Sequence, residues 1–204
     1  EYYVGQTIGE IWGYRTGGLF QTDAAAQVND LSALGNNWLA GDVNYLDVNG
    51  DGKVTPGNQT LEDPGDRRII GNESLNYRFG INLDLRYKNW TLNTFFQGIL
   101  QGDYFPDTGN WRAFWPWNAG HGEWYYITDS WTPENPNAYF PAPHIGYNDK
   151  KNYAVNDRYL QDAAYIRLKQ LTLNYRVPQD VVDLIGLASL NLYYSGQNLW
   201  EATN

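Results

Sequence analysis

The chain has 204 residues, of which 42% are hydrophobic and 16% aromatic, and its formal net charge is −9 at pH 7. This acidic balance excludes nucleic acid as an expected partner, because neutralising phosphates takes clustered Lys and Arg and no basic run occurs. The chain has no Cys, which excludes a disulfide scaffold, a thiolate nucleophile and a thiolate metal site.

The remaining composition points to a segment that meets both water and an apolar phase. Trp and Tyr are abundant, with 9 and 17 copies, and both suit places that are apolar at one end and wet at the other. No apolar stretch of about 18 residues occurs, so no membrane-spanning helix is predicted, but barrel strands span with only half their residues apolar. Because the chain has no Met, we expect an internal or trimmed segment of a longer protein.

Residues 1–20 are strand-like, with Gly punctuation. From about residue 22 to residue 74 the chain becomes polar and rich in Gly, Asn and Asp, which predicts a long irregular excursion. Within this excursion, residues 24–34 are expected to form one short helix.

The excursion contains the sequence DVNGDG, which is typical of the first half of a calcium loop. Three oxygen ligands at alternate positions precede Gly52, and a backbone carbonyl follows. The expected ligands are the side chains of Asp47, Asn49 and Asp51 and the carbonyl of Lys53. Oxygen donors without His or Cys favour Ca²⁺ over zinc.

The second half of this calcium motif is incomplete. Its twelfth position is Asn58 instead of the usual Glu. Closure is therefore expected from a later acidic residue, and the candidates are Glu62, Asp63 and Asp66. The alternative is an Asx-rich turn whose side chains cap their own backbone.

Residues 77–87 predict a β-strand with one apolar and one polar face, because apolar side chains recur with a period of two. The apolar row consists of Tyr77, Phe79, Ile81, Leu83, Leu85 and Tyr87. A tight turn at 88–89 leads into a return strand whose shared face holds Trp90, Leu92, Thr94 and Phe96. At about 3.3 Å per residue and a tilt of roughly 40°, residues 77–87 rise about 28 Å, close to the apolar band and aromatic rims of an outer-membrane barrel.

Residues 98–164 form a second long excursion, crowded with Trp, Pro, Asn and Gly. Flat aromatic rings beside Asn, Asp and Arg can stack on sugar rings or clamp peptide backbones, so Trp residues are candidates for ligand contact. These candidates are Trp111, Trp115, Trp117, Trp124 and Trp131. The alternative, compatible with the first, is that such a long loop builds its own small core from aromatic residues and Pro.

No catalytic residue is predicted in this excursion. The chain has 2 His residues, and His121 and His144 both lie among Gly and Pro without a recognisable nucleophile setting. Asp129 and Glu134 could act as glycosidase acids, but any acidic loop offers such pairs. We therefore expect that the protein is not an enzyme.

Two further strands are predicted near the end of the chain. The first places Leu171, Leu173, Tyr175 and Val177 on one face, and the second places Ala188, Leu190, Leu192 and Tyr194 on one face. Residues 178–187 form a short link with one helical turn. Long connections (15–76 and 99–164) thus alternate with short ones (88–89 and 178–187), as extracellular loops and periplasmic turns do in an outer-membrane barrel. A half-buried soluble sheet shares the side-chain alternation and is the alternative.

A set of motifs in this order resembles the C-terminal part of SusC/RagA-type TonB-dependent outer-membrane transporters. The motifs are DVNGDGKVT with DPGDRRIIGN, YRFGINLDLRYKNWTLNTFFQG, WTPENPNAYFP, NDRYLQDAAYIRLKQLTLNYRVP and LNLYYSGQNLW, and they cover nearly the whole chain. Members of this family often close the acidic loop with an Asp at the twelfth position. Here the corresponding Asp-Arg pair arrives later, as Asp66-Arg67, so the resemblance assigns Asp66 as the closing ligand.

The resemblance implies that residues 1–204 are one all-β segment of an antiparallel transmembrane barrel of about 22 strands, with extracellular loops at about 15–76 and 99–164 and without the plug domain. It implies a bacterial outer-membrane importer that takes up oligosaccharides or peptides with a SusD-like surface lipoprotein. The TonB complex would act through regions not in this segment. Odd-numbered residues of 77–87 would then face membrane lipid and even-numbered ones the lumen. The alternative function is a soluble or surface-attached, calcium-stabilised carbohydrate-binding β domain.

Overall fold

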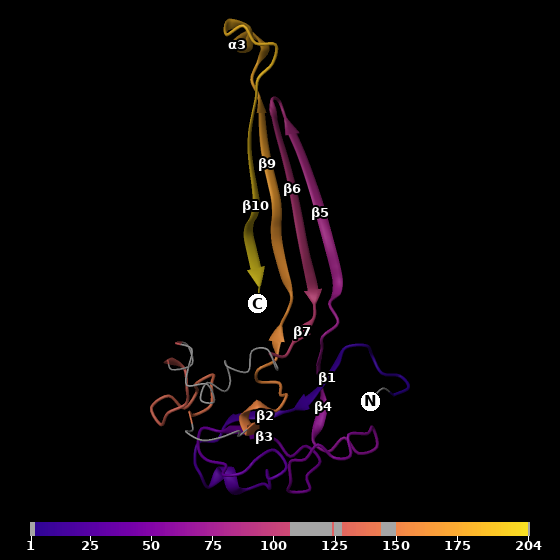
Figure 1. Ribbon diagram of the computed structural model, residues 1–204, viewed down its shortest axis with the longest axis vertical. Helices are drawn as coiled ribbons and strands as arrows, with labels where there is room; N and C mark the ends of the chain where they lie inside the picture. The colour runs from indigo at the N-terminus through magenta and orange to yellow at the C-terminus, as the bar shows by residue number, and fades with distance from the viewer. Residues whose placement is uncertain (1–2, 107–123, 125–127, 144–149, 204) are drawn as a thin grey trace. The chain divides into compact units, whose positions relative to one another are not determined.

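The computed structural model describes residues 3–106, 124, 128–143 and 150–203 (Figure 1). The chain divides into two compact units, and each is built from two separate stretches. We call Glu1–Glu73 with Tyr104–Gln161 the loop unit, and Ser74–Asp103 with Asp162–Asn204 the sheet unit. Among the described residues, no helix is long and apolar enough to cross a membrane.

The sheet unit is a four-stranded antiparallel sheet with the strand order β10-β9-β6-β5. Its strands are β5 (Asn76–Tyr87), β6 (Trp90–Gln101), β9 (Tyr165–Arg176) and β10 (Asn191–Thr203). β5 and β6 form a hairpin in which the turn residue Lys88 has a φ of 52°. The short helix α3 (Gln179–Leu184) links β9 to β10. The predicted all-β class, the antiparallel hairpin and the helical turn are therefore confirmed.

The last strand differs from the prediction at both ends. β10 begins at Asn191 instead of residue 188, and it continues to Thr203, beyond the predicted row that ends at Tyr194. The alternation is hidden there because the pairing of β10 with β9 is irregular between Gln197 and Trp200. Within this irregularity Asn198 has a φ of 51°, a left-handed conformation that Asn tolerates better than most residues.

A second irregularity lies where β6 pairs with β9. Phe95 pairs with Gln170 and the next residue, Phe96, pairs with Leu168, so β9 contains one residue more than β6 at this point. Such a bulge reverses the alternation of the strand that contains it. As a result Leu168 lies on the same face as Leu171, although a regular strand would place them on opposite faces.

The loop unit contains short antiparallel strand pairs. β1 (Glu10–Tyr14) pairs with β4 (Arg67–Asn72), and β2 (Thr16–Leu19) pairs with β3 (Val43–Tyr45). Elsewhere β7 (Asp103–Tyr104) pairs with β8 (Gln161–Asp162), and η1 (Ala25–Gln27) and η3 (Lys150–Tyr153) are 3₁₀ turns. Residues 15–76 are thus less irregular than the composition indicated.

The helix expected over residues 24–34 is wrong, because only Ala25–Gln27 form a 3₁₀ turn. Asp30 explains this outcome. Its backbone N–H donates to the Gly52 carbonyl at 2.9 Å, and its carbonyl accepts from the Val54 N–H at 2.8 Å. Its side chain accepts from the Ser32 N–H at 3.0 Å, so these bonds to other parts of the chain replace those of a helix.

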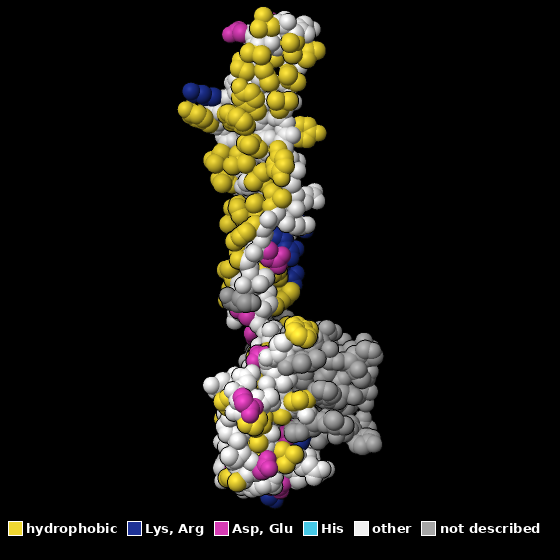
Figure 2. All heavy atoms as spheres, turned by 90° about the vertical axis from the view of Figure 1, so that its left-hand side faces the viewer, with side chains coloured by type: hydrophobic (Ala, Val, Ile, Leu, Met, Phe, Trp, Pro, Cys, Tyr) yellow, Lys and Arg dark blue, Asp and Glu magenta, His cyan; other side chains and the backbone are white. Residues whose placement is uncertain are grey.

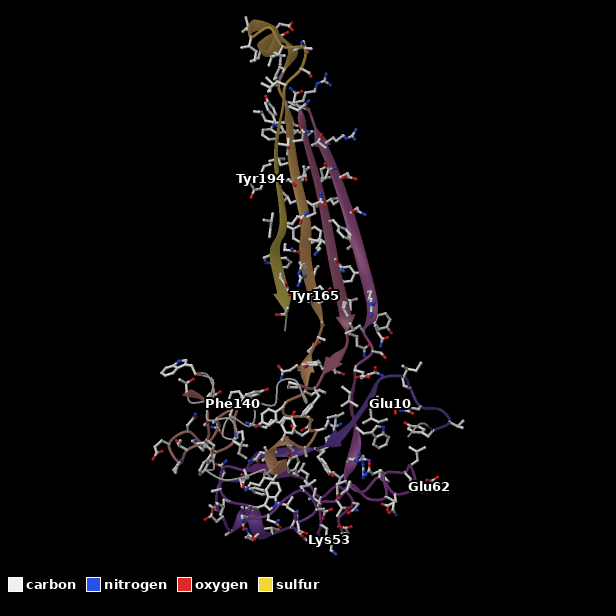
Figure 3. The ribbon with its side chains drawn as sticks, viewed as in Figure 1. Glu10, Lys53, Glu62, Phe140, Tyr165 and Tyr194 are labelled. Atoms are coloured by element: carbon white, nitrogen blue, oxygen red, sulfur yellow. The ribbon has the colours of Figure 1, made fainter. Side chains whose placement is uncertain are left out.

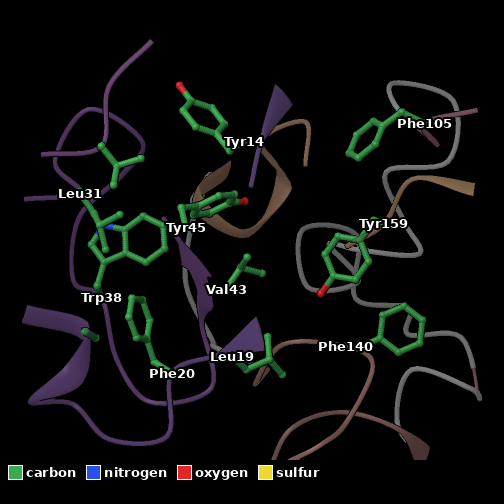
Figure 4. Close-up of a cluster of buried hydrophobic side chains, with 12 residues drawn as sticks. Tyr14, Leu19, Phe20, Leu31, Trp38, Val43, Tyr45, Phe105, Phe140 and Tyr159 are labelled. Carbon is green, nitrogen blue, oxygen red and sulfur yellow. The ribbon is translucent and has the colours of Figure 1, made fainter. Parts of the chain in front are cut away.

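A hydrophobic core lies in the loop unit and gathers aromatic side chains from both of its stretches (Figure 4). The buried Tyr45 ring makes edge-to-face contacts with Tyr14 and Trp38, at centroid distances of 5.6 and 5.9 Å. From the second stretch, Phe140 and Tyr159 stack at 6.5 Å. Aromatic rings supply much apolar area per residue, which explains how long, polar connections form a core.

An ion pair is buried in the same unit. Lys151 Nζ lies 2.8 Å from Asp42 Oδ2, and the two side chains are 4% and 0% exposed. Asp42 also accepts a hydrogen bond from Asn152 Nδ2 at 2.8 Å, and Lys151 donates to the Asn37 carbonyl at 2.8 Å. These contacts join the two stretches of the loop unit.

Candidate functional site

One face of the sheet unit is almost entirely apolar. The register places the apolar rows of all the strands side by side. This apolar face consists of Phe79, Ile81, Leu83, Leu85, Tyr87, Trp90, Leu92, Phe96, Ile166, Leu168, Leu171, Leu173, Tyr175, Leu192, Tyr194, Trp200 and Ala202. Thr94, Gly98 and Gly196 complete its rows. Figure 2 shows hydrophobic side chains along the length of this unit.

The apolar face is exposed within the sheet unit. On β5, Ile81 is 53% exposed, Leu83 43% and Leu85 51%. At the hairpin end, Tyr87 lies opposite Trp90, which packs against Tyr175 at a centroid distance of 4.5 Å. Apolar surface on this scale marks contact with another molecule or with a membrane.

The opposite face is mainly polar, and its side chains pair across the strands. Asp84 accepts a hydrogen bond from Asn93, and Thr172 and Ser195 share a hydrogen bond of 3.1 Å. Arg167 Nη2 lies 2.6 Å from Glu201 Oε2. Each pair joins directly opposite residues in the register, which is where cross-strand pairs stabilise a sheet. Phe95 and Ile99 are apolar exceptions on this face.

The predicted calcium ligands lie in one turn of the loop unit, where their side chains accept backbone hydrogen bonds (Figure 3 labels Lys53). Asp47 accepts from the N–H groups of Gly50 at 2.6 Å and Gly52 at 2.7 Å. The bond from Gly52 is the main reason that the pKa of the Asp47 carboxyl is lowered. Asn49 Oδ1 accepts from the Asp51 N–H at 3.0 Å, and Asp51 Oδ1 from the Lys53 N–H at 2.8 Å.

Asp66 lies behind this turn and is fully buried. Its carboxylate accepts from the N–H groups of Val48 and Thr55, both at 2.8 Å, and of Asn49 at 3.4 Å. Asp66 thus stabilises the turn through these backbone hydrogen bonds, as a capping residue does. In the part of the chain that the structure describes, no three His, Cys, Asp or Glu side chains form a group that could hold a metal ion. The expected ligand set also uses an amide oxygen and a backbone carbonyl, so calcium binding stays a prediction.

The aromatic ligand candidates are only partly described. Trp111, Trp115 and Trp117 lie outside the described residues. Trp124 is 74% exposed, whereas Trp131 packs against the core of the loop unit and donates to Gln21 Oε1 at 3.4 Å. Trp124 is therefore accessible and Trp131 is packed, and ligand contact by these residues stays a prediction.

The residues considered for catalysis are only partly described. His121 and His144 also lie outside the described residues. Asp129 accepts a hydrogen bond of 3.5 Å from Asn135 Nδ2, which lies next to Glu134 in the chain.

Sequence reasoning missed a cavity of about 520 Å³ in the loop unit. Its lining residues are Tyr3, Gln6, Trp12, Asn58, Gln59, Thr60, Leu61, Glu62, Pro64 and Arg67. From the sequence, Glu62 was a candidate for closing the calcium loop and Asn58 its twelfth position, while Arg67 was only the neighbour of Asp66. The alternation in β1 and β4 could have placed Trp12 and Arg67 on one face, but only once the pairing of these strands was known.

No family model matches the chain. TonB-dependent receptor P3 of Formosa agariphila is 29% identical over 200 residues, which cover 98% of this chain and 18% of the receptor. TonB-dependent receptor P26 of the same organism is 29% identical over 171 residues, covering 83% of this chain and 16% of the receptor. The chain thus spans less than a fifth of the length of these relatives.

Solved structures share the fold. A chain of the RagAB peptide transporter matches with a TM-score of 0.56 and 20% identity, covering 95% of this chain and 19% of that one. The RagAB peptide importer in its open-open state matches with a TM-score of 0.58 and 18% identity, over 100% of this chain and 20% of that one. The chain is thus similar in sequence to a segment of TonB-dependent receptors, and it shares the fold of a segment of the RagAB transporter chain.

Proposed function

We propose that the chain is part of an importer in the bacterial outer membrane, and that its sheet unit is a section of the barrel wall. The observation that carries this proposal is the two-faced sheet, with apolar rows exposed on one side and hydrogen-bonded polar pairs on the other. In a barrel wall the first face contacts lipid and the second lines a watery path.

The dimensions of the strands support this proposal. β5, β6 and β9 have 12 residues each, and at about 3.3 Å per residue and a tilt of roughly 40° they rise about 30 Å. The apolar band of such barrels is about 25 Å tall and has aromatic residues at its rims. Tyr87, Trp90 and Tyr175 supply one rim at the hairpin end of the sheet.

The loop unit is proposed to lie on the extracellular side. Both of its stretches are long connections between consecutive sheet strands or precede the first of them, and long connections are extracellular in these barrels. A surface lipoprotein of the SusD type is the proposed partner, and TonB supplies the force through other parts of the receptor. The RagAB likeness supports a two-component importer, and the cargo class remains oligosaccharide or peptide.

Position-specific labelling of the intact receptor in lipid vesicles tests the facing of the sheet. The segment has no Cys, so Leu83→Cys and its neighbour Asn82→Cys each add a single labelling site here. We expect brominated acyl chains to quench a fluorophore at residue 83, and aqueous iodide to quench one at residue 82. Equal quenching at the two positions would reject the barrel wall and favour a soluble or surface-attached carbohydrate-binding domain.

The partner and the metal have separate tests. A tagged receptor extracted from outer membranes should retain a surface lipoprotein through purification, and its complete absence would argue against a SusD-type partner. For calcium, titration calorimetry on the intact receptor should show a binding heat that Asp51→Asn reduces. Import itself needs no covalent chemistry from these residues, and the relatives are named receptors and transporters.

A further inference from the structure

Arg67 has a side-chain nitrogen atom that finds no hydrogen-bond acceptor among the described residues of the loop unit. It begins β4 opposite Tyr14, and its Nε atom is buried without a hydrogen-bond partner among the described residues. The neighbouring Arg68 differs, because its Nη1 donates to the Gly65 carbonyl at 2.9 Å and to the Arg67 carbonyl at 2.7 Å. The Nε atom is closed to solvent and therefore also to a ligand, but Arg67 lines the cavity, so an acceptor from outside the chain would be met by the Nη groups of its guanidinium.

Aromatic rings form a second wall of this cavity. The Tyr3 and Trp12 rings meet edge to face, with centroids 6.4 Å apart. Glu10 orients them, since its carboxylate accepts hydrogen bonds from the Tyr3 hydroxyl and, at 3.3 Å, from Trp12 Nε1. Glu10 also accepts from the Thr7 N–H at 2.8 Å. Its negative charge is therefore held by donors of β1 and the segment before it.

The third wall is the loop 57–65, whose two ends lie in close contact. Gly57 and Gly65 approach so closely that a Cβ on either would lie 2.4 Å from the backbone nitrogen of the other. Asp63 holds the loop from within, because Asp63 Oδ2 accepts from the Asn58 N–H at 3.1 Å and the Asp63 N–H donates to Thr60 Oγ1 at 3.1 Å. A loop held in this way orders few residues on binding, which favours affinity.

The polar side chains on this loop wall suit a ligand rich in hydrogen-bonding groups. Asn58, Gln59 and Thr60 line the cavity next to one acidic residue, Glu62. Glu62 is exposed, and Figure 3 shows it at the periphery of the loop unit. Its charge is screened by water and salt, whereas Arg67 is only partly exposed. The cavity therefore favours an anion at its Arg67 side.

We propose that this cavity binds an oxyanion carried on a ring, such as the carboxylate or sulfate group of an acidic sugar residue. The guanidinium group of Arg67 would take two oxygens of the anion, a geometry that Arg matches better than Lys. Trp12 would pack against the ring, and the amide side chains of Asn58 and Gln59 would meet ring hydroxyls. A volume of about 520 Å³ lies within the usual range for small-ligand sites. The inference stands on the loop unit alone and does not depend on the facing of the sheet.

The test is a binding titration of the purified intact receptor with galacturonate, galactose 6-sulfate, galactose and acetate. We expect the two acidic sugars to bind, the uncharged galactose to bind at least tenfold more weakly, and acetate, which has no ring, to bind weakly. A preference between the two acidic sugars identifies carboxylate or sulfate as the better anion. Binding should also weaken as salt is raised.

Substitutions of lining residues, compared with a control outside the cavity, test whether the sugars bind in this cavity. Arg67→Gln should reduce binding of the acidic sugars at least tenfold, and Arg67→Lys should give an intermediate affinity. Arg15→Gln is the matched control, because Arg15 is a half-exposed arginine of the same unit that pairs with Asp157 at 3.6 Å and does not line the cavity. Trp12→Leu should weaken binding of the sugars and leave that of acetate unchanged.

The proposal is wrong if neither acidic sugar binds, or if Arg67→Gln and Arg15→Gln bind them equally well. If Arg67→Gln does not fold, Arg67→Lys and Trp12→Leu carry the same comparison, with thermal melting as the check on folding. A negative result here would leave the quenching pattern at residues 82 and 83 unchanged, so it is distinguishable from failure of the barrel wall.

Discussion

A lysine at position 83 offers a quantitative test of the lipid-facing surface. Leu83 is four residues from Tyr87, the aromatic end of β5, so it lies about 10 Å below that rim at 3.3 Å per residue and a 40° tilt. In a band of about 25 Å this is close to the midplane, where a charged residue costs about 2–4 kcal/mol. The flexible stem of Lys recovers part of the cost, so we expect about 2–3 kcal/mol for Leu83→Lys.

Such a change corresponds to a folding equilibrium that is about 30-fold to 150-fold less favourable. It can be measured by urea titration of the intact receptor in lipid vesicles, with the gel shift of the folded barrel as the signal. Asn82→Lys is the control, because Asn82 is the next residue along β5 and lies on the polar face. We expect a change within about 0.5 kcal/mol for this control.

The comparison of neighbouring positions makes the outcome informative. If Leu83→Lys costs no more than Asn82→Lys, the apolar face does not contact hydrocarbon and the assignment fails. If Asn82→Lys is the more damaging of the two, the faces are reversed.

Three further predictions concern the loop unit. Lys151→Met leaves the buried Asp42 carboxylate unpaired and should cost about 3–5 kcal/mol, whereas Lys53→Met at an exposed position should be neutral in the same thermal melt. Gly65→Ala places a Cβ 2.3 Å from the Thr55 carbonyl oxygen and should lower the melting temperature more than Gly50→Ala, because Gly50 also has a positive φ but has open space around it. The lowered pKa of Asp47 stabilises the turn above pH about 4. This contribution should disappear as the pH falls through the folded pKa, and acid titration of Asp47→Asn should lack that loss.

The sheet could be predicted from the sequence because the patterns that specify its strands involve residues close together in the chain. Alternation over 77–87 and the short turn at 88–89 give the hairpin, and both depend on neighbouring residues. The ends of the pattern were less predictable, since Leu168 and Trp200 rejoin the apolar rows only through irregular pairing. A bulge has no composition of its own in these strands, so local alternation alone does not place Leu168 and Trp200 on the apolar face.

The loop unit was predictable only in outline, because its interactions connect residues far apart in the chain. The backbone N–H of Val43 donates a hydrogen bond to Asn152 Oδ1 at 2.8 Å, and no local pattern indicates this contact. The turn with Asp47 was visible as a motif. Its attachment to the buried Asp66, and the pairing that brings Trp12 near Arg67, depend on the tertiary fold.

The order of the segments along the chain has a consequence for folding during synthesis. β5 and β6 can pair as soon as residue 101 has been made, whereas the Asp42 carboxylate has only its local bond from the Leu39 N–H, at 2.8 Å, until Lys151 and Asn152 follow. Burial of that charge without Lys151 is unfavourable, so closure of the earlier stretch of the loop unit depends on the later one. The later stretch, which lies beyond the hairpin, decides when the earlier one can close.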